Sequence, residues 1–283
     1  MKTSIRHRLM RLGILCGGIG IFLAALIGVS YILNIEKSMS DELGSSVVNS
    51  VTSSMQEEMT FLANGLRDSY SGDNNDIFNN VFLMGEERSY DYSDFEADCA
   101  SLTKDGVLVC YLPAARCHLF ALGRGSDIIV GELREGYFDY VTDTMSGDGK
   151  YGFIVNNKNG DVLISSEKGK CGTNITGQTV YAENFAACTA GDALITGDMF
   201  TDFVVYSGSL PQNSEFGVIY QVDSDMIYGK GKRAILIMAV LTAVMIILVT
   251  IVSTLFARRI SASIAPTVEC LDKFSEGTID TSF

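Results

Sequence analysis

Two long apolar segments divide the chain. Positions 12–33 and 234–257 contain no charged residue. At about 1.5 Å of rise per residue, each is long enough as a helix to cross a hydrocarbon core of roughly 30 Å. Between them lie 200 mostly polar residues. The pattern predicts two transmembrane helices that flank a domain on one side of the membrane, with both termini on the other side.

A helical period continues beyond the first apolar segment, from position 34 to about 70. Apolar residues recur there every three or four positions and no proline interrupts them, which indicates an amphipathic helix. Its length predicts a stalk that pairs with a second copy in a homodimer. The alternative is a helix that packs only on its own domain. The apolar positions are Ile35, Met39, Leu43, Val47, Val51, Met55, Met59, Leu62 and Leu66.

After a turn at 71–76 the period becomes alternating, which favours short antiparallel strands. The first expected strands are 99–103, 107–112, 117–122 and 127–133. A short helix should follow, with one face formed by Leu133, Tyr137, Val141 and Met145.

A second strand region begins with a hairpin, because 151–155 and 161–165 flank the turn sequence Asn-Asn-Lys-Asn-Gly. A loop-rich stretch runs to about position 192, and the remaining strands are expected at 193–200, 203–208 and 216–222. Two strands, a loop-rich crossing and three strands give the order of a PAS-like antiparallel sheet. A helix from Asp225 should lead into the second apolar segment. The predicted fold class is therefore α+β.

Charge orients this arrangement. The net charge is −13, yet the first eleven residues hold four basic side chains and no acidic one. Basic residues beside a first membrane helix favour the cytoplasm, so we expect both termini there and positions 34–233 outside. Lys230, Lys232 and Arg233 lie on the outer side against this rule, but long segments cross largely regardless of charge. The outer segment holds 30 acidic and 14 basic residues, which argues against nucleic acid as a partner.

The outer segment contains an odd number of cysteines, five, so at least one is unpaired. If disulfides form, Cys110 with Cys117 and Cys171 with Cys188 are the expected pairs. Buried reduced cysteines are the alternative. The sequence has no Cys-x-x-Cys motif, and we expect no zinc site.

Catalytic motifs are weak. His118, on an expected strand, fits a structural role. Ser165 and Lys168 match Ser-x-x-Lys, but they follow a hairpin strand and no Lys-Thr-Gly comes later, so we interpret the match as coincidence. The sequence has no phosphate loop, nucleophile elbow or His-Glu-x-x-His. We expect a protein that is not an enzyme and needs no cofactor or metal.

Three stretches together resemble the Cache family of extracytoplasmic bacterial sensor domains. The hairpin YGFIVNNKNGDVLISSEKGKCGTNITGQ (151–178) resembles the family's central hairpin, and FGVIYQVDSDMIY (216–228) resembles its last strand and helix. The stretch DIIVGELREGYFDY (127–140) resembles the passage between the lobes of double-Cache domains. The resemblance implies a membrane-distal part at 71–146, which is an abbreviated lobe or an extension of a single Cache domain, a membrane-proximal lobe at 147–233, and a small-molecule ligand.

The tail at 258–283 resembles the first helix of a HAMP linker, with Pro266, a helix through Phe274 and a stop at Glu276-Gly277. This implies the front part of a longer receptor, most like methyl-accepting chemotaxis receptors, whose output lies in a cytoplasmic signalling domain or partner. The alternatives are the sensor module of a histidine kinase or diguanylate cyclase, or a membrane-anchored structural or adhesion protein without a small ligand.

The chain departs from the family in two places. It has no tryptophan, and Phe216 takes the place of the one common in the final strand. Only Arg88 and Tyr90 match the spacing of the family's amino-acid-binding set, so we carry over no amino-acid ligand.

A PAS-like fold would place a pocket between the sheet and the loop-rich crossing. Residues expected to line it are Tyr151, Phe153, Ser165, Tyr181, Phe203, Tyr206 and Tyr220. Arg124, with Arg116 and Lys168, is a candidate contact for an anionic ligand. The alternatives are a core position for each aromatic ring and a solvated position for each charge.

Overall fold

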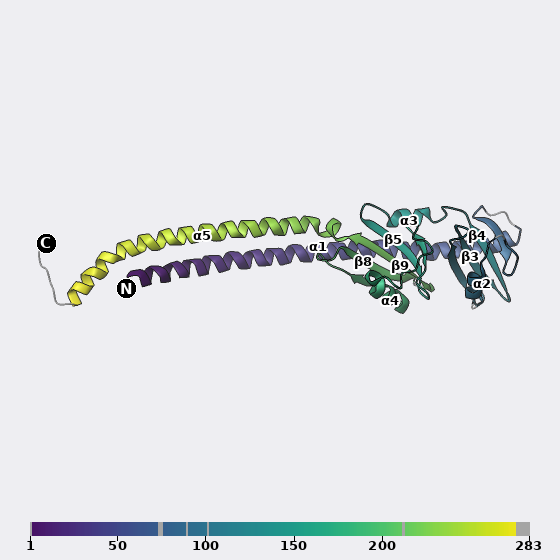
Figure 1. The fold of residues 1–283 in the computed structure, drawn as a ribbon, viewed down its shortest axis with the longest axis horizontal. Coiled ribbons are helices and arrows are strands. Elements are labelled where there is room, and N and C mark those ends of the chain that lie inside the picture. The colour runs from purple at the N-terminus through teal and green to yellow at the C-terminus, as the bar shows by residue number, and fades with distance from the viewer. Residues whose placement is uncertain (1, 73–75, 89, 101, 211–212, 276–283) are drawn as a thin grey trace. The chain divides into compact units, whose positions relative to one another are not determined.

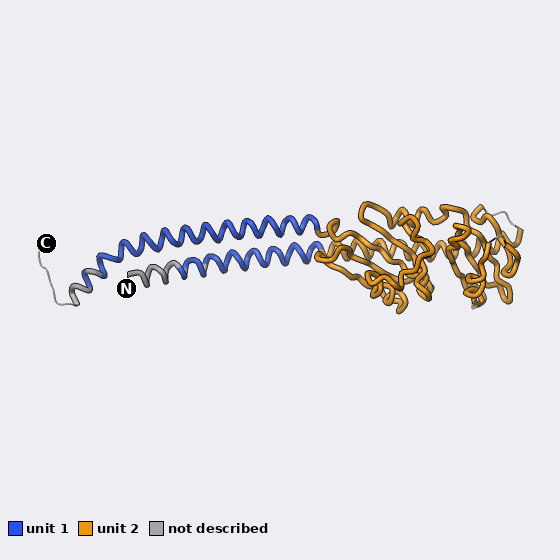
Figure 2. The backbone as a smooth tube through the Cα atoms, viewed as in Figure 1, with its two compact units in different colours: residues 1–36, 229–283 blue, residues 37–228 orange. Residues whose placement is uncertain are grey.

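A computed structural model of the chain describes residues 2–72, 76–88, 90–100, 102–210 and 213–275. Two long helices, α1 (Lys2–Tyr70) and α5 (Ser224–Ser275), contain the two apolar segments, and two antiparallel sheets lie between them in the sequence (Figure 1). The α+β class is confirmed. The chain divides into two compact units, residues 1–36 with 229–283, and residues 37–228 (Figure 2).

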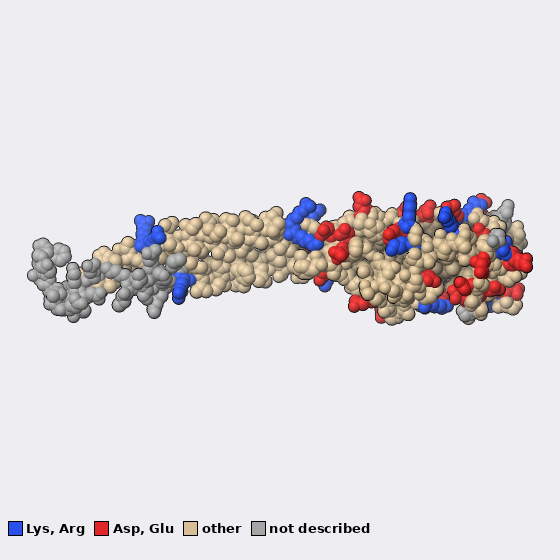
Figure 3. Space-filling view, in the orientation of Figure 1, with Lys and Arg blue, Asp and Glu red and all other residues tan. Residues whose placement is uncertain are grey.

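In the first unit, α1 and α5 run antiparallel. A Cβ added to Gly13 would lie 2.8 Å from Ser253 Oγ, and one added to Gly17 would lie 2.8 Å from Val249 Cγ1. The absence of a side chain at these glycines therefore allows the helices to approach closely. Both helices are long and apolar enough to cross a membrane. Figure 3 shows a surface without charged side chains between two groups of basic residues on this unit.

The first sheet has four strands. Across the sheet they are β1 (Phe78–Leu83), β4 (Asp127–Leu133), β3 (Cys117–Arg124) and β2 (Val107–Leu112). The predicted strand at 99–103 is wrong, because a helix, α2 (Ser93–Cys99), ends there. Phe95 and Cys99 lie one helical turn apart and are both buried, so the helical spacing decides the structure. The fourth strand is β1, which pairs with β4.

The second sheet has the predicted PAS-like order. Its strands are β6 (Val162–Ser165), β5 (Lys150–Asn156), β9 (Asn213–Asp223), β8 (Phe203–Leu210) and β7 (Leu194–Thr196).

Short helices lie between and beside the sheets. The helix α3 (Asp139–Met145) connects them, starting later than expected because Leu133 still belongs to β4. The stretch expected to be loop-rich contains a 3₁₀ turn, η1 (Thr179–Tyr181), and the helix α4 (Ala182–Ala190). The helix α4 is rich in alanine, the strongest helix former, and ends at Gly191 in the left-handed conformation.

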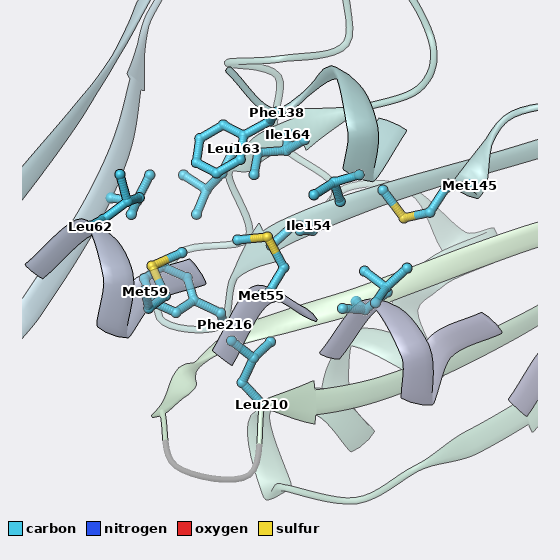
Figure 4. Packing of buried hydrophobic residues seen from close by; sticks show 14 of the residues in the cluster. Met55, Met59, Leu62, Phe138, Met145, Ile154, Leu163, Ile164, Leu210 and Phe216 are labelled. Atoms are coloured by element: carbon cyan, nitrogen blue, oxygen red, sulfur yellow. The ribbon is translucent and has the colours of Figure 1, made fainter. Parts of the chain in front are cut away.

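One apolar stripe on α1 packs against both sheets. Val51, Met55, Met59, Leu62 and Leu66 are 0–3% exposed and belong to a single cluster with strands of each sheet (Figure 4). This part of the stalk therefore packs on its own domain, which was the alternative interpretation.

Earlier positions of the same predicted stripe are exposed. Met39 is 58% exposed and Leu43 is 66% exposed. A homodimer formed through this end of the stalk stays a prediction.

A tight contact joins α1 to the second sheet. The ring of Tyr206 on β8 lies against Gly44, where an added Cβ would collide with three ring carbons. The hydroxyl groups of Tyr206 and Ser40 are hydrogen bonded. Two residues further along β8, a Cβ on Gly208 would lie 2.9 Å from Val48 Cγ1. Two glycines, one on each element, therefore set the distance between helix and sheet.

We expect Gly44→Ala to lower the free energy of unfolding by about 1–3 kcal/mol, the usual cost of overpacking, because the ring of Tyr206 has no space to move away. Urea unfolding of the purified chain in detergent, followed by circular dichroism, measures this. Gly177→Ala is the matched control, since a Cβ there meets nothing within 4 Å. Equal stability of both variants would contradict the contact.

Candidate functional site

The second sheet separates the predicted pocket residues onto two faces. Strand pairing and alternation place one group on the face covered by α4: Tyr151, Phe153, Ser165, Tyr181 and Phe203. Tyr206 and Tyr220 pair with each other on the opposite face, against α1. The structure therefore does not bring these seven side chains into one chamber.

On the α4 face the aromatic side chains fill the interior. Phe153 is 2% exposed, and its ring contacts that of Tyr181 edge-to-face at 5.1 Å between centroids. Tyr181 donates a hydrogen bond from its hydroxyl to Gln221 Oε1 at 2.5 Å. These contacts are those of a packed core.

The other predicted ligand contacts lie apart from this face. Tyr206 and Tyr220 are buried with ring centroids 6.1 Å apart. Arg124 ends β3 in the first sheet, with its guanidinium 5.4 Å from the centre of the Tyr70 ring. Arg116 occupies the turn before β3.

A cavity of about 410 Å³ lies at the junction of the two sheets. Its walls come from β3, from the segment at 136–146 that includes α3, and from β6 with the loop that follows it. Ser165 and Lys168 from the sequence analysis both line it, and so does His118. The polar and titratable side chains of the lining are His118, Tyr137, Asp139, Thr142, Asp143, Ser146, Ser165, Ser166, Lys168 and Cys171.

His118 supports the wall of this cavity. Its Nε2 lies 2.8 Å from the carbonyl oxygen of Leu163, so a neutral ring donates that hydrogen bond. The imidazole contacts the rings of Tyr111 and Phe138 at 5.0 and 5.1 Å between centroids. Burial lowers the pKa of His118, which favours the neutral form. The contacts on both faces and at Nε2 indicate a structural role.

Tyr137 connects the cavity to the stalk helix. Its hydroxyl and that of Tyr140 both donate hydrogen bonds to the carboxylate of Glu58 on α1, the second at 2.9 Å. Burial, followed by the contact with Glu58, raises the pKa of each phenol, so both remain donors at neutral pH. The hydrogen bond of Tyr137 therefore joins the cavity wall to α1, and that of Tyr140, which does not line the cavity, joins α3 to the same carboxylate.

The cavity presents charges of both signs. Lys168 is exposed at its rim and makes no ion pair with any described residue. Asp139 and Asp143 lie on the α3 wall, and the hydroxyls of Thr142 and Ser165 add donors and acceptors. Such a lining suits a small polar molecule held by several hydrogen bonds.

Two further cavities lie elsewhere in the same unit. One of about 490 Å³ adjoins α1 and contains the ion pairs Arg67–Asp105 (2.5 Å) and Lys158–Glu215 (2.6 Å). Another, of about 460 Å³, lies between α2, β2 and the β5–β6 hairpin. We take the cavity at α3 as the candidate site. Its basic side chain, Lys168, makes no ion pair with any described residue, whereas Arg67 and Lys158 in the cavity at α1 are already paired with Asp105 and Glu215. Its lining residue Tyr137 also hydrogen bonds to Glu58 on α1.

The five outer cysteines are free thiols. Neither expected disulfide is formed, and the strand register places Cys110 opposite Leu119 rather than Cys117. Burial raises the pKa of the Cys99 and Cys110 thiols to about 12 and that of Cys117 and Cys188 to about 11. Among the described residues, no group of His, Cys, Asp and Glu is arranged to hold a metal ion.

No protein-family model matches the sequence, and no curated protein sequence matches it. Solved structures do resemble the fold. The ligand-binding domain of the Pseudomonas aeruginosa amino-acid chemoreceptor PctB with L-Gln is 14% identical, with a TM-score of 0.43 over 66% of this chain and 90% of that one. The ligand-binding domain of the Pseudomonas fluorescens chemoreceptor CtaA with L-leucine is 12% identical, with a TM-score of 0.42 over 70% and 99%.

The extracellular domain of the putative histidine kinase rpHK1S-Z16 is 11% identical, with a TM-score of 0.39 over 73% of this chain and 99% of that one. Because the identities and TM-scores are low, the function proposed below rests on the contacts of this chain.

We expect Tyr137→Phe to lower the free energy of unfolding by roughly 1–2 kcal/mol, because it removes a hydrogen bond to a carboxylate and leaves one oxygen of Glu58 less satisfied. Urea unfolding measures the change. Tyr151→Phe is the control, since no described residue bonds its hydroxyl. If both variants lose the same stability, the Glu58 contact contributes nothing.

The raised pKa values of the cysteine thiols predict that the stability of the folded chain depends on pH. An unfolded cysteine has a pKa near 8.5, whereas burial raises the pKa of the buried Cys99 and the partly buried Cys110 to about 12. Above pH ~9 the unfolded chain therefore loses protons that the folded chain retains, and stability should fall as pH rises from about 9 toward 12. Thermal unfolding midpoints in reductant at pH 7, 9 and 10 test this, and a constant midpoint would contradict it.

Proposed function

We propose that this chain is the sensing and membrane-spanning part of a bacterial receptor. Helical segments at 12–33 and 234–257 cross the membrane, positions 34–233 lie outside, and both termini are cytoplasmic. A small molecule binds in the cavity at α3. The observation that carries this proposal is the pair of hydrogen bonds from Tyr137 and Tyr140 to Glu58, because they join the cavity wall to the helix that enters the first span.

A ligand in this cavity acts on the stalk by moving α3. Tyr137 lines the cavity and hydrogen bonds to Glu58, so a shift of α3 either carries α1 with it or breaks the contact. Helix shifts of about 1–2 Å are typical of such switches. A coupling free energy of roughly 1–3 kcal/mol changes an output several-fold. The ligand must bind the two arrangements with different affinity, or no signal is sent.

The second helix receives the signal through the sheet. The edge strand β6 lines the cavity and pairs with β5, which pairs with β9. Strand β9 ends at Asp223 and α5 begins at Ser224, without a linker. A displacement of β6 is therefore transmitted through two ladders of backbone hydrogen bonds to the first residue of α5.

The lining suggests the ligand's chemistry. Lys168 is the basic side chain of the cavity and has no described ion-pair partner, so it suits a carboxylate. Asp139 and Asp143 suit hydroxyl or amine groups on the same molecule. We propose a small carboxylate-bearing metabolite as the ligand class.

Assembly and output complete the proposal. The exposed apolar side chains of Met39 and Leu43 support a homodimer along the stalk. The helix α5 continues as far as Ser275 with Pro266 inside it, which suits a HAMP-like linker; Glu276-Gly277, its expected stop, lies outside the described residues. We propose a chemoreceptor-like output through a cytoplasmic signalling domain or partner.

We expect a panel of carboxylate metabolites to contain one that raises the unfolding midpoint of the purified chain, since a ligand at 100 times its Kd stabilises a protein by about 2.7 kcal/mol. Lys168→Ala should weaken that ligand's binding about tenfold or more, as loss of a charge-assisted contact does. Calorimetry measures the affinity.

Lys104→Ala is the matched control, because Lys104 is exposed and does not line this cavity. Binding that Lys168→Ala leaves unchanged would move the site elsewhere. If no metabolite shifts the midpoint, the structural or adhesion alternative gains support.

A further inference from the structure

Phe200 is the most exposed large hydrophobic side chain in the described part of the chain, at 85%. Among the large hydrophobic side chains whose exposure is described in the two apolar segments, none exceeds 68%. It lies in the connection between β7 and β8, in an otherwise water-facing domain. An apolar ring gains free energy when its surface leaves water, so a covering partner would stabilise this arrangement.

The exposure of Phe200 does not come from a loose chain end. Its backbone N–H donates to Asp198 Oδ1 at 2.8 Å, and Thr201 Oγ1 lies 2.8 Å from the carbonyl oxygens of both Asp198 and Phe203, to either of which its hydroxyl can donate. Gly197 has φ of 91° and passes so close to the Phe203 carbonyl that a Cβ would collide with it. The turn at 197–202 therefore holds the ring in place.

This turn is attached to the beginning of α5. The backbone N–H of Ser224 donates to the carbonyl oxygen of Asp202 at 2.9 Å, and its hydroxyl donates to that of Asp198 at 3.1 Å. Ser224 is 1% exposed. Because β8 and β9 are antiparallel, the turn before β8 lies at the end of the sheet from which α5 departs.

The chain length between this turn and the second apolar segment is short. Ser224 precedes position 234 by ten residues, which span about 15 Å as a helix. The polar headgroup layer occupies roughly 5–8 Å of that distance on each side of the hydrocarbon core. The start of α5 would therefore lie on the order of 10 Å above the headgroup layer. A six-residue turn with an aromatic side chain at its tip can cover that distance. Lys230, Lys232 and Arg233 lie within the same ten residues and suit lipid phosphates.

We propose that Phe200 inserts into the lipid headgroup layer of the outer leaflet, so that the turn at 197–202 rests on the bilayer beside the start of α5. Aromatic side chains are enriched at this depth of a membrane. The carboxylates of Asp198 and Asp202 in the same turn would be repelled by a strongly anionic surface. The partner we propose is therefore a zwitterionic phospholipid surface. The inference requires that 234–257 spans the bilayer, but it does not depend on the ligand cavity.

The proposed lipid contact would also constrain movements that pass from β9 to α5. The turn that holds Phe200 also bonds Ser224, so the bilayer surface fixes the height at which α5 begins. A shift of β9 along the membrane normal then has to move this turn as well.

The chain has no tryptophan, so a single Phe→Trp substitution gives a unique fluorophore. Phe200→Trp, in the full chain reconstituted into phosphatidylcholine liposomes brominated near the headgroup end of the acyl chains, should show bromine quenching. Phe61→Trp is the matched control. Phe61 is 56% exposed on α1, 28 residues beyond the first apolar segment, or about 40 Å along a helix. We expect quenching at position 200 to exceed that at position 61 about twofold or more.

Phe22→Trp, at the middle of the first apolar segment, reports separately on membrane insertion in liposomes brominated near the methyl end of the acyl chains, because a shallow bromine lies too far from the centre of the bilayer to quench it. Quenching at position 22 with none at position 200 overturns the lipid contact and leaves the proposed topology intact. No quenching at position 22 refutes the membrane assignment itself. A blue-shifted but unquenched emission at position 200 shows that protein, such as a second copy, covers the ring, and also overturns the proposal.

Discussion

The buried stripe of α1 is the interaction on which the domain depends. Each sheet has one face covered by its own short helix, α2 or α4, and the other face against α1. The side chains from Val48 to Leu66 are the shared covering of those two inner faces. Close packing tolerates few intermediate positions, so a helix held by two sheets moves between discrete arrangements rather than continuously.

The polar contacts beside the apolar stripe of α1 have stricter geometric requirements than the apolar contacts of the stripe. Glu58 accepts hydrogen bonds from the segment between the sheets, while Ser40 bonds to Tyr206 from the second sheet. A hydrogen bond depends steeply on distance and angle, whereas the burial of apolar surface is non-directional. The polar contacts therefore select which arrangement of the stripe is occupied, and the cavity at α3 has access to one of them through Tyr137.

The periodicity of the sequence was sufficient for much of the fold. A helical period that ends near position 70 and the positions of the strands of the second sheet both follow from the spacing of apolar residues, whereas the PAS-like order came from comparison with a known fold. The first sheet was harder. Its strand β1 has buried residues at Phe78 and Phe82 with a register shift between Phe78 and Asn80, so strict alternation is lost. Segment α2 is short enough that Phe95 and Cys99 give only a single helical spacing.

The site was less predictable, for a geometric reason. Side chains alternate between the two faces of a strand, so the sequence tells which residues of one strand share a face. The register between strands and the identity of the covering helix depend on tertiary structure. Phe153 and Tyr206 are both aromatic strand residues, yet one faces α4 and the other faces α1. Ser165 and Lys168 reach the cavity because they end an edge strand and begin its loop, where side chains are not covered by a further strand.

The two long helices are attached to the second sheet in different ways. The helix α5 continues from β9 by peptide bonds, and Ser224 at its start is buried and hydrogen bonded, so it follows every displacement of the sheet. By contrast, α1 is attached only through side chains, and at Gly44 and Gly208 the surfaces in contact have no Cβ on one side. The Tyr206 ring is seated at Gly44, so this contact fixes the distance between α1 and the sheet. The movement of α1 that we propose would therefore act first on side-chain contacts, among which the hydrogen bonds of Glu58 and Ser40 depend most steeply on distance and angle.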